Sequence, residues 1–277
     1  MTVEPLTDYS RLCVHTITTK GWEIEEAIDC YKEAGVSGIT VWRQWLEGHN
    51  PDKVGDRIRS AGLKIVSLCR GGFYPAIKEA ARAGAIDDNR LAIEQAAALG
   101  APLVVLVCGA DPGQSLAESR KQIIDGIAAN LPLAESLGIK LAIEPLHPMY
   151  ANDRSAINTL ASANDICDKL NHPLVGITYD VYHLWWDPAL EAETIRAAKA
   201  NRLFAYHVCD WLTPTTDLLN DRGLMGEGCI ELRRIRGLVE SVGFKGMIEV
   251  EIFSDRWWKQ STDKFLESIK HSYLNYT

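Results

Sequence analysis

The sequence of 277 residues lacks the features that mark secreted, membrane-spanning and nucleic-acid-binding proteins. Its first ten residues contain Glu4 and Asp8 and no apolar stretch, so we expect no secretory leader. Apolar runs such as residues 102–107 are far too short to cross a bilayer. No basic cluster occurs, and the net charge is −8, with 29 Lys and Arg against 37 Asp and Glu. Because neutralised phosphates supply most of the affinity for nucleic acids, we expect neither a nucleic-acid nor a membrane partner.

Two further features are absent, a disulfide framework and a glycine-rich phosphate turn, and they bear on the cellular compartment and on the fold. The seven cysteines are odd in number and scattered, with no Cys-x-x-Cys pair, so a disulfide framework is not indicated. We therefore expect a reducing, cytoplasmic location. A doubly wound open sheet usually carries a glycine-rich phosphate turn after its first strand. Here the corresponding segment, residues 15–21, reads His-Thr-Ile-Thr-Thr-Lys-Gly, which disfavours that architecture.

Short β-rich apolar runs alternate with amphipathic or alanine-rich segments along the whole chain. The pattern predicts strands near residues 12–17, 38–42, 64–68, 103–107, 141–143, 175–179, 203–208 and 247–252. Helices are predicted near residues 24–34, 52–61, 89–99, 115–137, 155–170, 190–200, 230–242 and 261–276. Continuously apolar strands are typical of parallel strands buried on both faces. Eight such βα units predict one domain, residues 1–277, folded as a single (β/α)8 TIM barrel.

All eight tryptophans fall at predicted strand ends or in the segments that follow them. In a TIM barrel these segments build the catalytic face. Indole rings there suit stacking against a sugar, and Trp186 is our candidate for a substrate contact. The alternative is that these rings pack loops or form a subunit interface, and the sequence leaves open whether the chain is a homo-oligomer.

Polar groups end four of the late strands. The pairs are Glu144 and His147, Asp180 and His183, His207 and Asp210, and Glu249 and Glu251. A strand buried on both faces tolerates a charge only when the charge is paired or binds a metal. Several carboxylates and an imidazole around one barrel mouth indicate a divalent cation such as Mn²⁺, Mg²⁺, Co²⁺ or Fe²⁺.

The same segments carry a family resemblance. Ile-Glu-Pro at 143–145, Tyr-Asp-Val-Tyr-His at 179–183, Tyr-His-Val-Cys-Asp at 206–210 and Ile-Glu-Val-Glu-Ile-Phe at 248–253 resemble the xylose-isomerase-like TIM-barrel sugar isomerases and epimerases. The superfamily also includes endonuclease IV type barrels. Similarity covers essentially the whole chain and is greatest to the inosose-isomerase-like and tagatose 3-epimerase-like branches.

The resemblance implies roles for particular residues. The metal ligands fall on Glu144, Asp180, His207 and Glu251. Mn²⁺ is the metal we expect first, with Mg²⁺, Co²⁺, Fe²⁺ and Zn²⁺ as alternatives. His183 and Arg222, the latter before the Gly-Glu-Gly turn at 226–228, correspond to substrate-binding residues of the family. Where the tagatose-epimerase branch has a second glutamate, this chain has Tyr150.

The expected reaction is the isomerisation or epimerisation of a keto-sugar or inosose through a metal-stabilised enediolate. Glu144 and Glu251 are the candidate proton acceptor and donor. A lyase is the alternative, because His147 resembles a feature of family members that cleave oxidised glycosides and can act as an extra base. His147 can equally be a structural residue between two prolines. A DNA-repair endonuclease is disfavoured by the seven histidines and the acidic charge.

Two finer expectations concern the loops at the barrel mouth. Asp210 either orients His207 or caps the loop that follows it. Residues 253–260 contain no glycine but do contain an acid and two tryptophans, so a backbone phosphate site is not indicated there. We therefore expect an unphosphorylated substrate, although Arg222, Arg256 and Lys259 could bind phosphate through their side chains.

Overall fold

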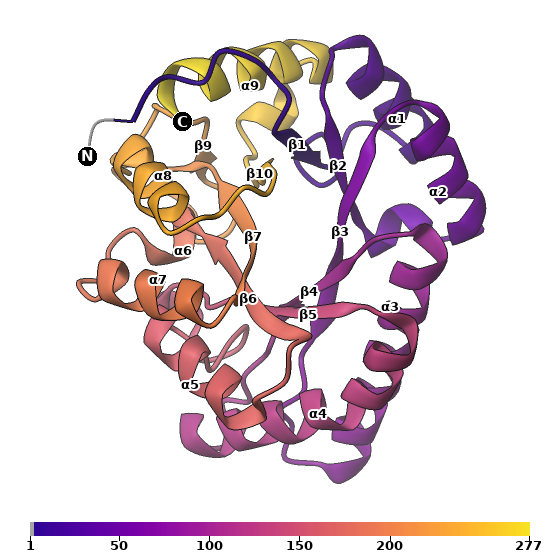
Figure 1. Ribbon diagram of the computed structural model, residues 1–277, viewed down its shortest axis with the longest axis vertical. Coiled ribbons are helices and arrows are strands. Elements are labelled where there is room, and N and C mark those ends of the chain that lie inside the picture. The colour runs from indigo at the N-terminus through magenta and orange to yellow at the C-terminus, as the bar shows by residue number, and fades with distance from the viewer. Residues whose placement is uncertain (1–2) are drawn as a thin grey trace.

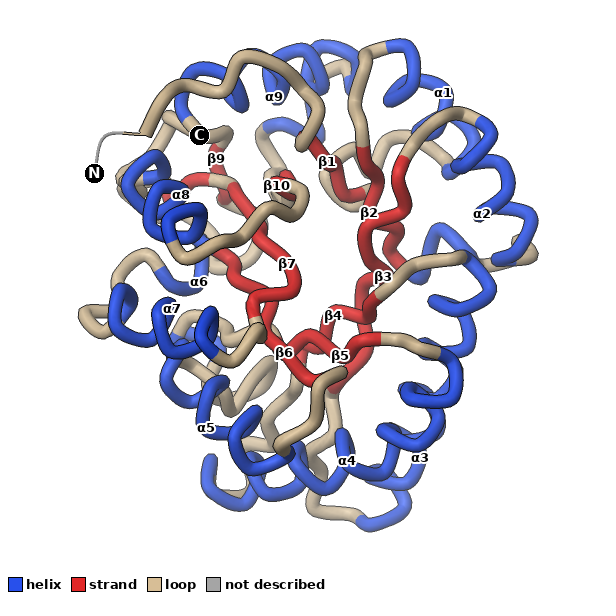
Figure 2. Tube along the Cα trace, in the orientation of Figure 1, coloured by secondary structure: helices blue, strands red, loops and turns tan. Residues whose placement is uncertain are grey.

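Eight parallel strands form a closed barrel in a computed structural model that describes residues 3–277. Figures 1 and 2 show the strands as an inner ring and the helices as an outer layer. The order around the barrel is β1-β10-β7-β6-β5-β4-β3-β2. The barrel strands are β1 (Leu12–His15), β2 (Gly38–Trp42), β3 (Lys64–Gly72), β4 (Leu103–Val107), β5 (Lys140–Ile143), β6 (Val175–Asp180), β7 (Leu203–Val208) and β10 (Ile248–Val250).

The helices cover the outside of the barrel in chain order. They are α1 (Ile24–Glu33), α2 (Pro51–Ser60), α3 (Glu79–Leu99), α4 (Leu116–Leu137), α5 (Leu160–Leu170), α6 (Val181–Leu184), α7 (Leu190–Lys199), α8 (Leu232–Ser241) and α9 (Thr262–Tyr276). Short elements decorate the loops: η1 (Arg43–Leu46), η2 (Pro148–Tyr150), η3 (Trp257–Lys259), and the two-stranded sheet of β8 (Asp210–Trp211) and β9 (Arg222–Gly223). The predicted TIM barrel is confirmed.

Local sequence explains where the longest helices end. Ser115 precedes α4, and its side chain accepts a hydrogen bond from the N–H of Glu118, which satisfies one free donor of the first turn. Gly100 and Gly138 follow α3 and α4 with φ of 85° and 68°, a left-handed conformation that residues with a Cβ rarely adopt. Each of these two helices therefore ends a few residues before the next strand begins.

Three boundaries differ from the predicted ones by more than two residues. Helix α3 begins ten residues early, at Glu79, because alanine, arginine and glutamate favour a helix more than the exposed Gly84 disfavours it. Helix α5 begins at Leu160, since Thr159 forms a capping box with Ser162. Strand β3 continues to Gly72 instead of ending at residue 68. That extension carries Arg70 toward the same end of the barrel as the polar strand ends.

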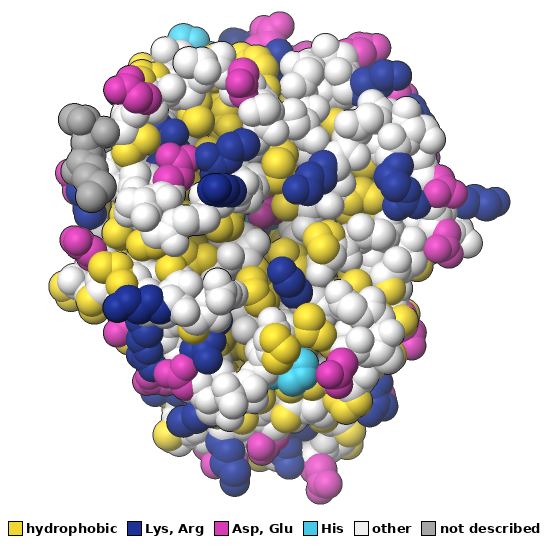
Figure 3. All heavy atoms as spheres, viewed as in Figure 1, with side chains coloured by type: hydrophobic (Ala, Val, Ile, Leu, Met, Phe, Trp, Pro, Cys, Tyr) yellow, Lys and Arg dark blue, Asp and Glu magenta, His cyan; other side chains and the backbone are white. Residues whose placement is uncertain are grey.

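The surface is mixed in charge. Figure 3 shows acidic and basic side chains interspersed around the rim of the face in view, without a continuous basic field on it. None of the helices in the described part of the chain is long and apolar enough to cross a membrane. All seven cysteines are free, and five of them are buried.

Candidate metal centre and active site

The predicted metal ligands converge at one end of the barrel. Glu144 directly follows β5, Asp180 ends β6, His207 lies in β7 and Glu251 directly follows β10. All four side chains are buried. One potential ligand atom from each lies within 4.8 Å of the corresponding atoms of the others. Four strands thus deliver three carboxylates and one imidazole to a common centre.

Several buried polar atoms at this centre lack a hydrogen bond. Within residues 3–277, neither ring nitrogen of His207 has a partner, nor does Oε1 of Glu144. His207 Nδ1 lies 3.3 Å from Glu144 Oε1 and 4.0 Å from Glu251 Oε1, so the three groups face one another. Buried polar atoms are almost always hydrogen-bonded, and exceptions require an explanation. The donor set fits a divalent cation, which would satisfy these atoms and offset the repulsion between the carboxylates.

The acids of the centre differ in their tendency to ionise. Burial raises the pKa of Asp180 to about 7, although the charge of Arg222 opposes the shift. Burial would also raise the pKa of Glu251. Its contact with His15 and the charge of Arg222 outweigh burial and hold that pKa well below the usual range. Glu251 is therefore the more firmly ionised of the two, and the site holds a carboxylate pair with unequal basicity.

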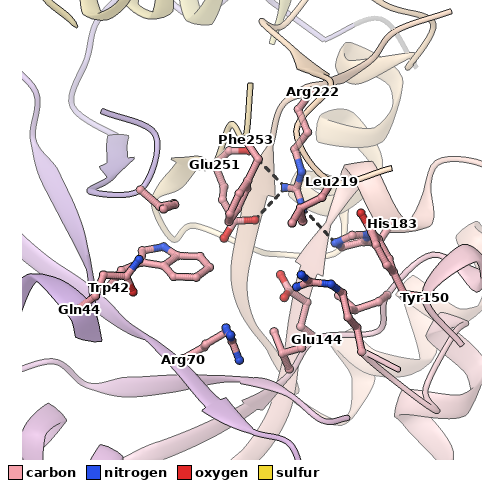
Figure 4. Close-up of a pocket in the computed structure, with 14 residues that line it drawn as sticks. Trp42, Gln44, Arg70, Glu144, Tyr150, His183, Leu219, Arg222, Glu251 and Phe253 are labelled. Carbon is pink, nitrogen blue, oxygen red and sulfur yellow. Dashed lines mark hydrogen bonds and ion pairs between the residues drawn. The ribbon is translucent and has the colours of Figure 1, made fainter. Parts of the chain in front are cut away.

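Arg222 on β9 bridges two of the candidate ligands. Its Nη1 lies 3.2 Å from Asp180 Oδ2 and 2.8 Å from Glu251 Oε2. The guanidinium carbon lies 4.4 Å from the centroid of the Tyr182 ring and 5.0 Å from that of Phe253. Figure 4 shows the guanidinium pointing to both Glu251 and His183. A buried arginine fixed in this way contributes a positive charge beside the carboxylates and a donor toward the cavity.

His183, on α6, is oriented by a backbone contact. The N–H of His147 donates to His183 Nδ1 over 3.2 Å. Burial, with the nearby charge of Arg222, lowers the pKa of His183 well below its usual range. Its Nε2 lies 3.2 Å from Arg222 Nη2, a guanidinium nitrogen that can only donate, and 3.6 Å from Asp180 Oδ2. Contacts with His147, Arg222 and Asp180 therefore fix the ring of His183 at the wall of the cavity.

His147 and Trp186 do not line the cavity at this centre. The Nδ1 of His147 accepts the N–H of Met149, and its ring packs against Trp186 and Trp211 at centroid distances of 5.5 and 4.9 Å. Trp186 donates its indole N–H to the carbonyl of His183. The expected roles of His147 as a base and of Trp186 as a substrate contact therefore find no support in this geometry. Both residues instead support His183.

His15 is a member of the cluster that sequence reasoning missed. It ends β1, and its Nδ1 and Nε2 lie 3.2 Å from Glu251 Oε1 and 3.3 Å from Glu249 Oε2. Burial would lower its pKa, but contacts with Cys69 and the two glutamates raise it well above the usual range. The signal was available, because His15 is a polar residue at a strand end like the four ligands.

Glu249 is buried in the barrel interior and is hydrogen-bonded there. Its Oε2 accepts hydrogen bonds from Thr40 at 2.6 Å and Ser67 at 3.2 Å. Together with His15 and His207 it forms a second group that could hold a metal, and His15, Cys69 and Glu251 form a third. Of the three groups found among residues 3–277, only that of Glu144, Asp180, His207 and Glu251 offers four potential ligands. The cavity is lined by two of these four and does not touch Glu249.

Asp210 resolves the choice between orienting His207 and capping a loop. Its carboxylate accepts the backbone N–H groups of Trp211, Gly226 and Ile230 over 2.8, 2.9 and 3.0 Å. No contact with His207 occurs in the described residues. Asp210 therefore holds the loop that presents Arg222, and the second alternative is correct.

A cavity of about 220 Å³ opens at the centre. Glu144, Glu251, His183 and Arg222 are among the polar residues that line it, and Figure 4 shows them. Among the tryptophans only Trp42 lines it, with its ring 5.4 Å from that of Phe253 in an edge-on arrangement. The other indoles pack elsewhere, as when Trp257 stacks on Phe265 at 4.9 Å. Loop packing therefore accounts for most of the tryptophans.

Comparison with known proteins agrees with the barrel fold. The xylose isomerase-like TIM barrel family matches residues 28–273. Inosose isomerase of Bacillus velezensis is 22% identical over 271 residues, which is 95% of each chain. The crystal structure of a Sinorhizobium meliloti 1021 protein superposes with a TM-score of 0.93 at 46% identity, covering 97% of this chain and 98% of that one. The structure of IolI with a bound zinc atom superposes with a TM-score of 0.83 at 22% identity, covering 95% and 96%.

Proposed function

Since this chain belongs to the xylose isomerase-like TIM barrel family, we propose that it is a divalent-metal-dependent sugar isomerase or epimerase. Its substrate in this proposal is an unphosphorylated keto-sugar or inosose. The observation that carries the proposal is the convergence of Glu144, Asp180, His207 and Glu251 beside a sugar-sized cavity. Similarity to the inosose isomerase of Bacillus velezensis supports the substrate class.

The four converging residues would hold the metal. Mn²⁺ suits three carboxylates with one imidazole, and the zinc in IolI supports Zn²⁺ as an alternative. A bound divalent cation supplies Lewis acidity, which stabilises negative charge on adjacent carbonyl and hydroxyl oxygens of a substrate. The ring nitrogens of His207, which make no hydrogen bond among residues 3–277, support its assignment as the imidazole ligand of the set.

The carboxylates of Glu144 and Glu251 are the groups that would move the proton. They reach the cavity from β5 and β10, which are separated by two other strands around the barrel. One carboxylate can therefore take a proton from the carbon beside the carbonyl, and the other can return it to a different face or carbon. His183 and Arg222 line the same cavity and would contact a substrate oxygen, which holds the reacting carbons between the two glutamates.

An isomerase outcome is favoured over the lyase by the position of His147. A lyase that used His147 as its extra base needs that imidazole at the substrate, but here it packs against Trp186 and Trp211 outside the cavity lining. The free cysteines are consistent with the cytoplasmic location that we propose.

The test is an exchange experiment in D₂O with the metal-free and the Mn²⁺-loaded enzyme. Keto-sugars, inososes and 3-oxidised glycosides are incubated, the metal is removed on a chelating resin, and the products are analysed by NMR. We expect an isomeric product with deuterium at the carbon next to the carbonyl, formed only by the loaded enzyme. A released fragment establishes the lyase instead, and equal turnover without metal refutes the proposal.

A further inference from the structure

Two arginines line the cavity apart from Arg222. Arg70 lies near the end of β3, and Arg154 lies in the loop between η2 and α5. Both are half-buried, and both line the cavity that contains Glu144 and Glu251. Figure 4 shows the Arg70 side chain entering the cavity from the side opposite Arg222.

Neither guanidinium has an ionic partner. Among residues 3–277, no carboxylate lies within 4.0 Å of Arg70 or Arg154, and neither side chain donates a hydrogen bond. Neighbouring Arg43 shows the contrast, because its Nη2 lies 2.8 Å from Asp88 Oδ1. The other contacts of the two are aromatic, with Arg70 4.3 Å from the centroid of the Phe73 ring and Arg154 5.7 Å from that of Tyr150.

A partly buried guanidinium without an acceptor is unfavourable in free energy, and a bound anion would remove that penalty. Burial lowers the pKa of Arg70, and the like charge of Arg154 lowers it further, with Glu144 opposing in part. Two positive charges that repel each other around the same space form a site for an anion. Guanidinium groups are also the donors best matched to the planar geometry of a carboxylate.

We infer that the substrate carries a carboxylate, bound by Arg70 and Arg154, at the end of the molecule remote from the reacting carbonyl. The inference rests on the proposed function, which places the carbonyl between Glu144, Glu251, His183 and Arg222. It specifies the substrate as a keto-sugar acid. A phosphate is disfavoured because the cavity lining contains no glycine, serine or threonine of the kind that forms a backbone phosphate site.

The first arm of the test measures turnover. D-fructose, D-fructuronate and D-fructose 6-phosphate differ only at the carbon farthest from the ketone, as alcohol, carboxylate and phosphate. With the Mn²⁺-loaded enzyme we expect a kcat/KM for the uronate at least about tenfold above that for either other sugar. Equal values for the uronate and the neutral sugar, or a preference for the phosphate, overturn the inference.

The variants Arg70→Met and Arg154→Met assign the preference to these side chains. Each should lower the ratio of kcat/KM for uronate over fructose by about tenfold to a hundredfold, the loss typical of a hydrogen bond to a charged group. Arg90→Met is the matched control, since Arg90 is exposed on α3 and pairs with Asp87. A ratio unchanged in both cavity variants overturns the inference, and Arg154→Met decides if Arg70→Met does not fold.

The second arm measures binding and does not require turnover. Gluconate and glucitol differ by a terminal carboxylate, and neither has a carbonyl to react. Calorimetry should show gluconate binding at least about tenfold more tightly than glucitol to the loaded wild-type enzyme, with the difference lost in Arg154→Met. If no sugar turns over but this preference holds, the proposed function fails and the anion site stands. If gluconate has no advantage, or keeps it in Arg154→Met, the anion site fails.

Discussion

Glu249 lies in β10, and Glu251 directly follows that strand. Replacing each of them by glutamine distinguishes a carboxylate that stabilises the barrel from one that we expect to bind the metal. Glu251 lies at the cavity, whereas Glu249 is bonded inside the barrel. We expect Glu251→Gln to lower the affinity for Mn²⁺ by at least about a hundredfold, as loss of a charged ligand does. Glu249→Gln should lower the affinity by only about tenfold, because Glu249 is absent from the four-ligand group but its Oε2 lies 3.7 Å from Nε2 of the ligand His207.

The cost of Glu249→Gln should appear in stability. The carboxylate accepts from Thr40 at 2.6 Å and Ser67 at 3.2 Å, and it lies 3.3 Å from His15 Nε2. Glutamine removes the charge opposite His15 and brings a second donor toward Thr40. Loss of one partner of a buried ion pair costs about 3 kcal/mol, which is about 6 °C in Tm for a domain of this size.

The stability loss should also depend on pH with a defined sign. Burial would raise the pKa of Glu249, but His207 and His15 lower it below the ordinary value of 4.5. The resulting stabilisation is complete above pH 4.5 and is lost as the pH falls through the lower native value. The difference in unfolding free energy between wild type and Glu249→Gln should therefore be largest near neutral pH and shrink in acid.

The assay combines metal titration by calorimetry with urea unfolding of the metal-free proteins. Both variants make the same chemical change on the same strand, so each controls for the other. The reasoning is refuted if Glu249→Gln loses the metal while Glu251→Gln retains it. It is also refuted if Glu249→Gln unfolds at the same urea concentration as wild type.

Three further predictions test other parts of the site. Prolonged chelation should abolish turnover without changing the far-ultraviolet circular dichroism. Mn²⁺ or Co²⁺ should then restore activity better than Ca²⁺, because Ca²⁺ prefers more oxygen ligands. Full activity in verified metal-free enzyme would contradict the proposed metal site. Arg222→Lys should lower kcat/KM by about a hundredfold, because an ammonium cannot bridge Asp180, Glu251 and the cavity as a planar guanidinium does. Steady-state kinetics measures this loss, and an unchanged Tm shows that the variant is folded. Asp210→Ala should destabilise the fold by about 2 kcal/mol in urea unfolding, since three backbone N–H groups lose their acceptor, and an unchanged midpoint would contradict the capping role.

The barrel and the polar strand ends were predictable from short-range patterns, whereas the choice of four ligands among those polar residues came from the family resemblance. Continuous apolar strands such as β4 indicate burial on both faces, and a charged residue at the end of such a strand needs a partner. Parallel strands then bring Glu144, Asp180, His207 and Glu251 to one end without any knowledge of the loops.

The remaining features depend on packing that the sequence pattern does not encode. Arg70 was missed because β3 continues beyond the apolar run that identified it. Arg154 was missed because it lies in a loop with no periodic signal. His147 and Trp186 lie near the site in sequence, but aromatic packing among Trp186, Trp211 and His147 keeps them out of the cavity.

The most direct test of the metal centre is a crystal structure of the Mn²⁺-loaded protein with data recorded at the manganese absorption edge. We predict one anomalous peak per barrel, coordinated by Glu144, Asp180, His207 and Glu251 and open to the cavity. A peak between His15, His207 and Glu249, or no peak at this end of the barrel in protein that is catalytically active, would contradict the account.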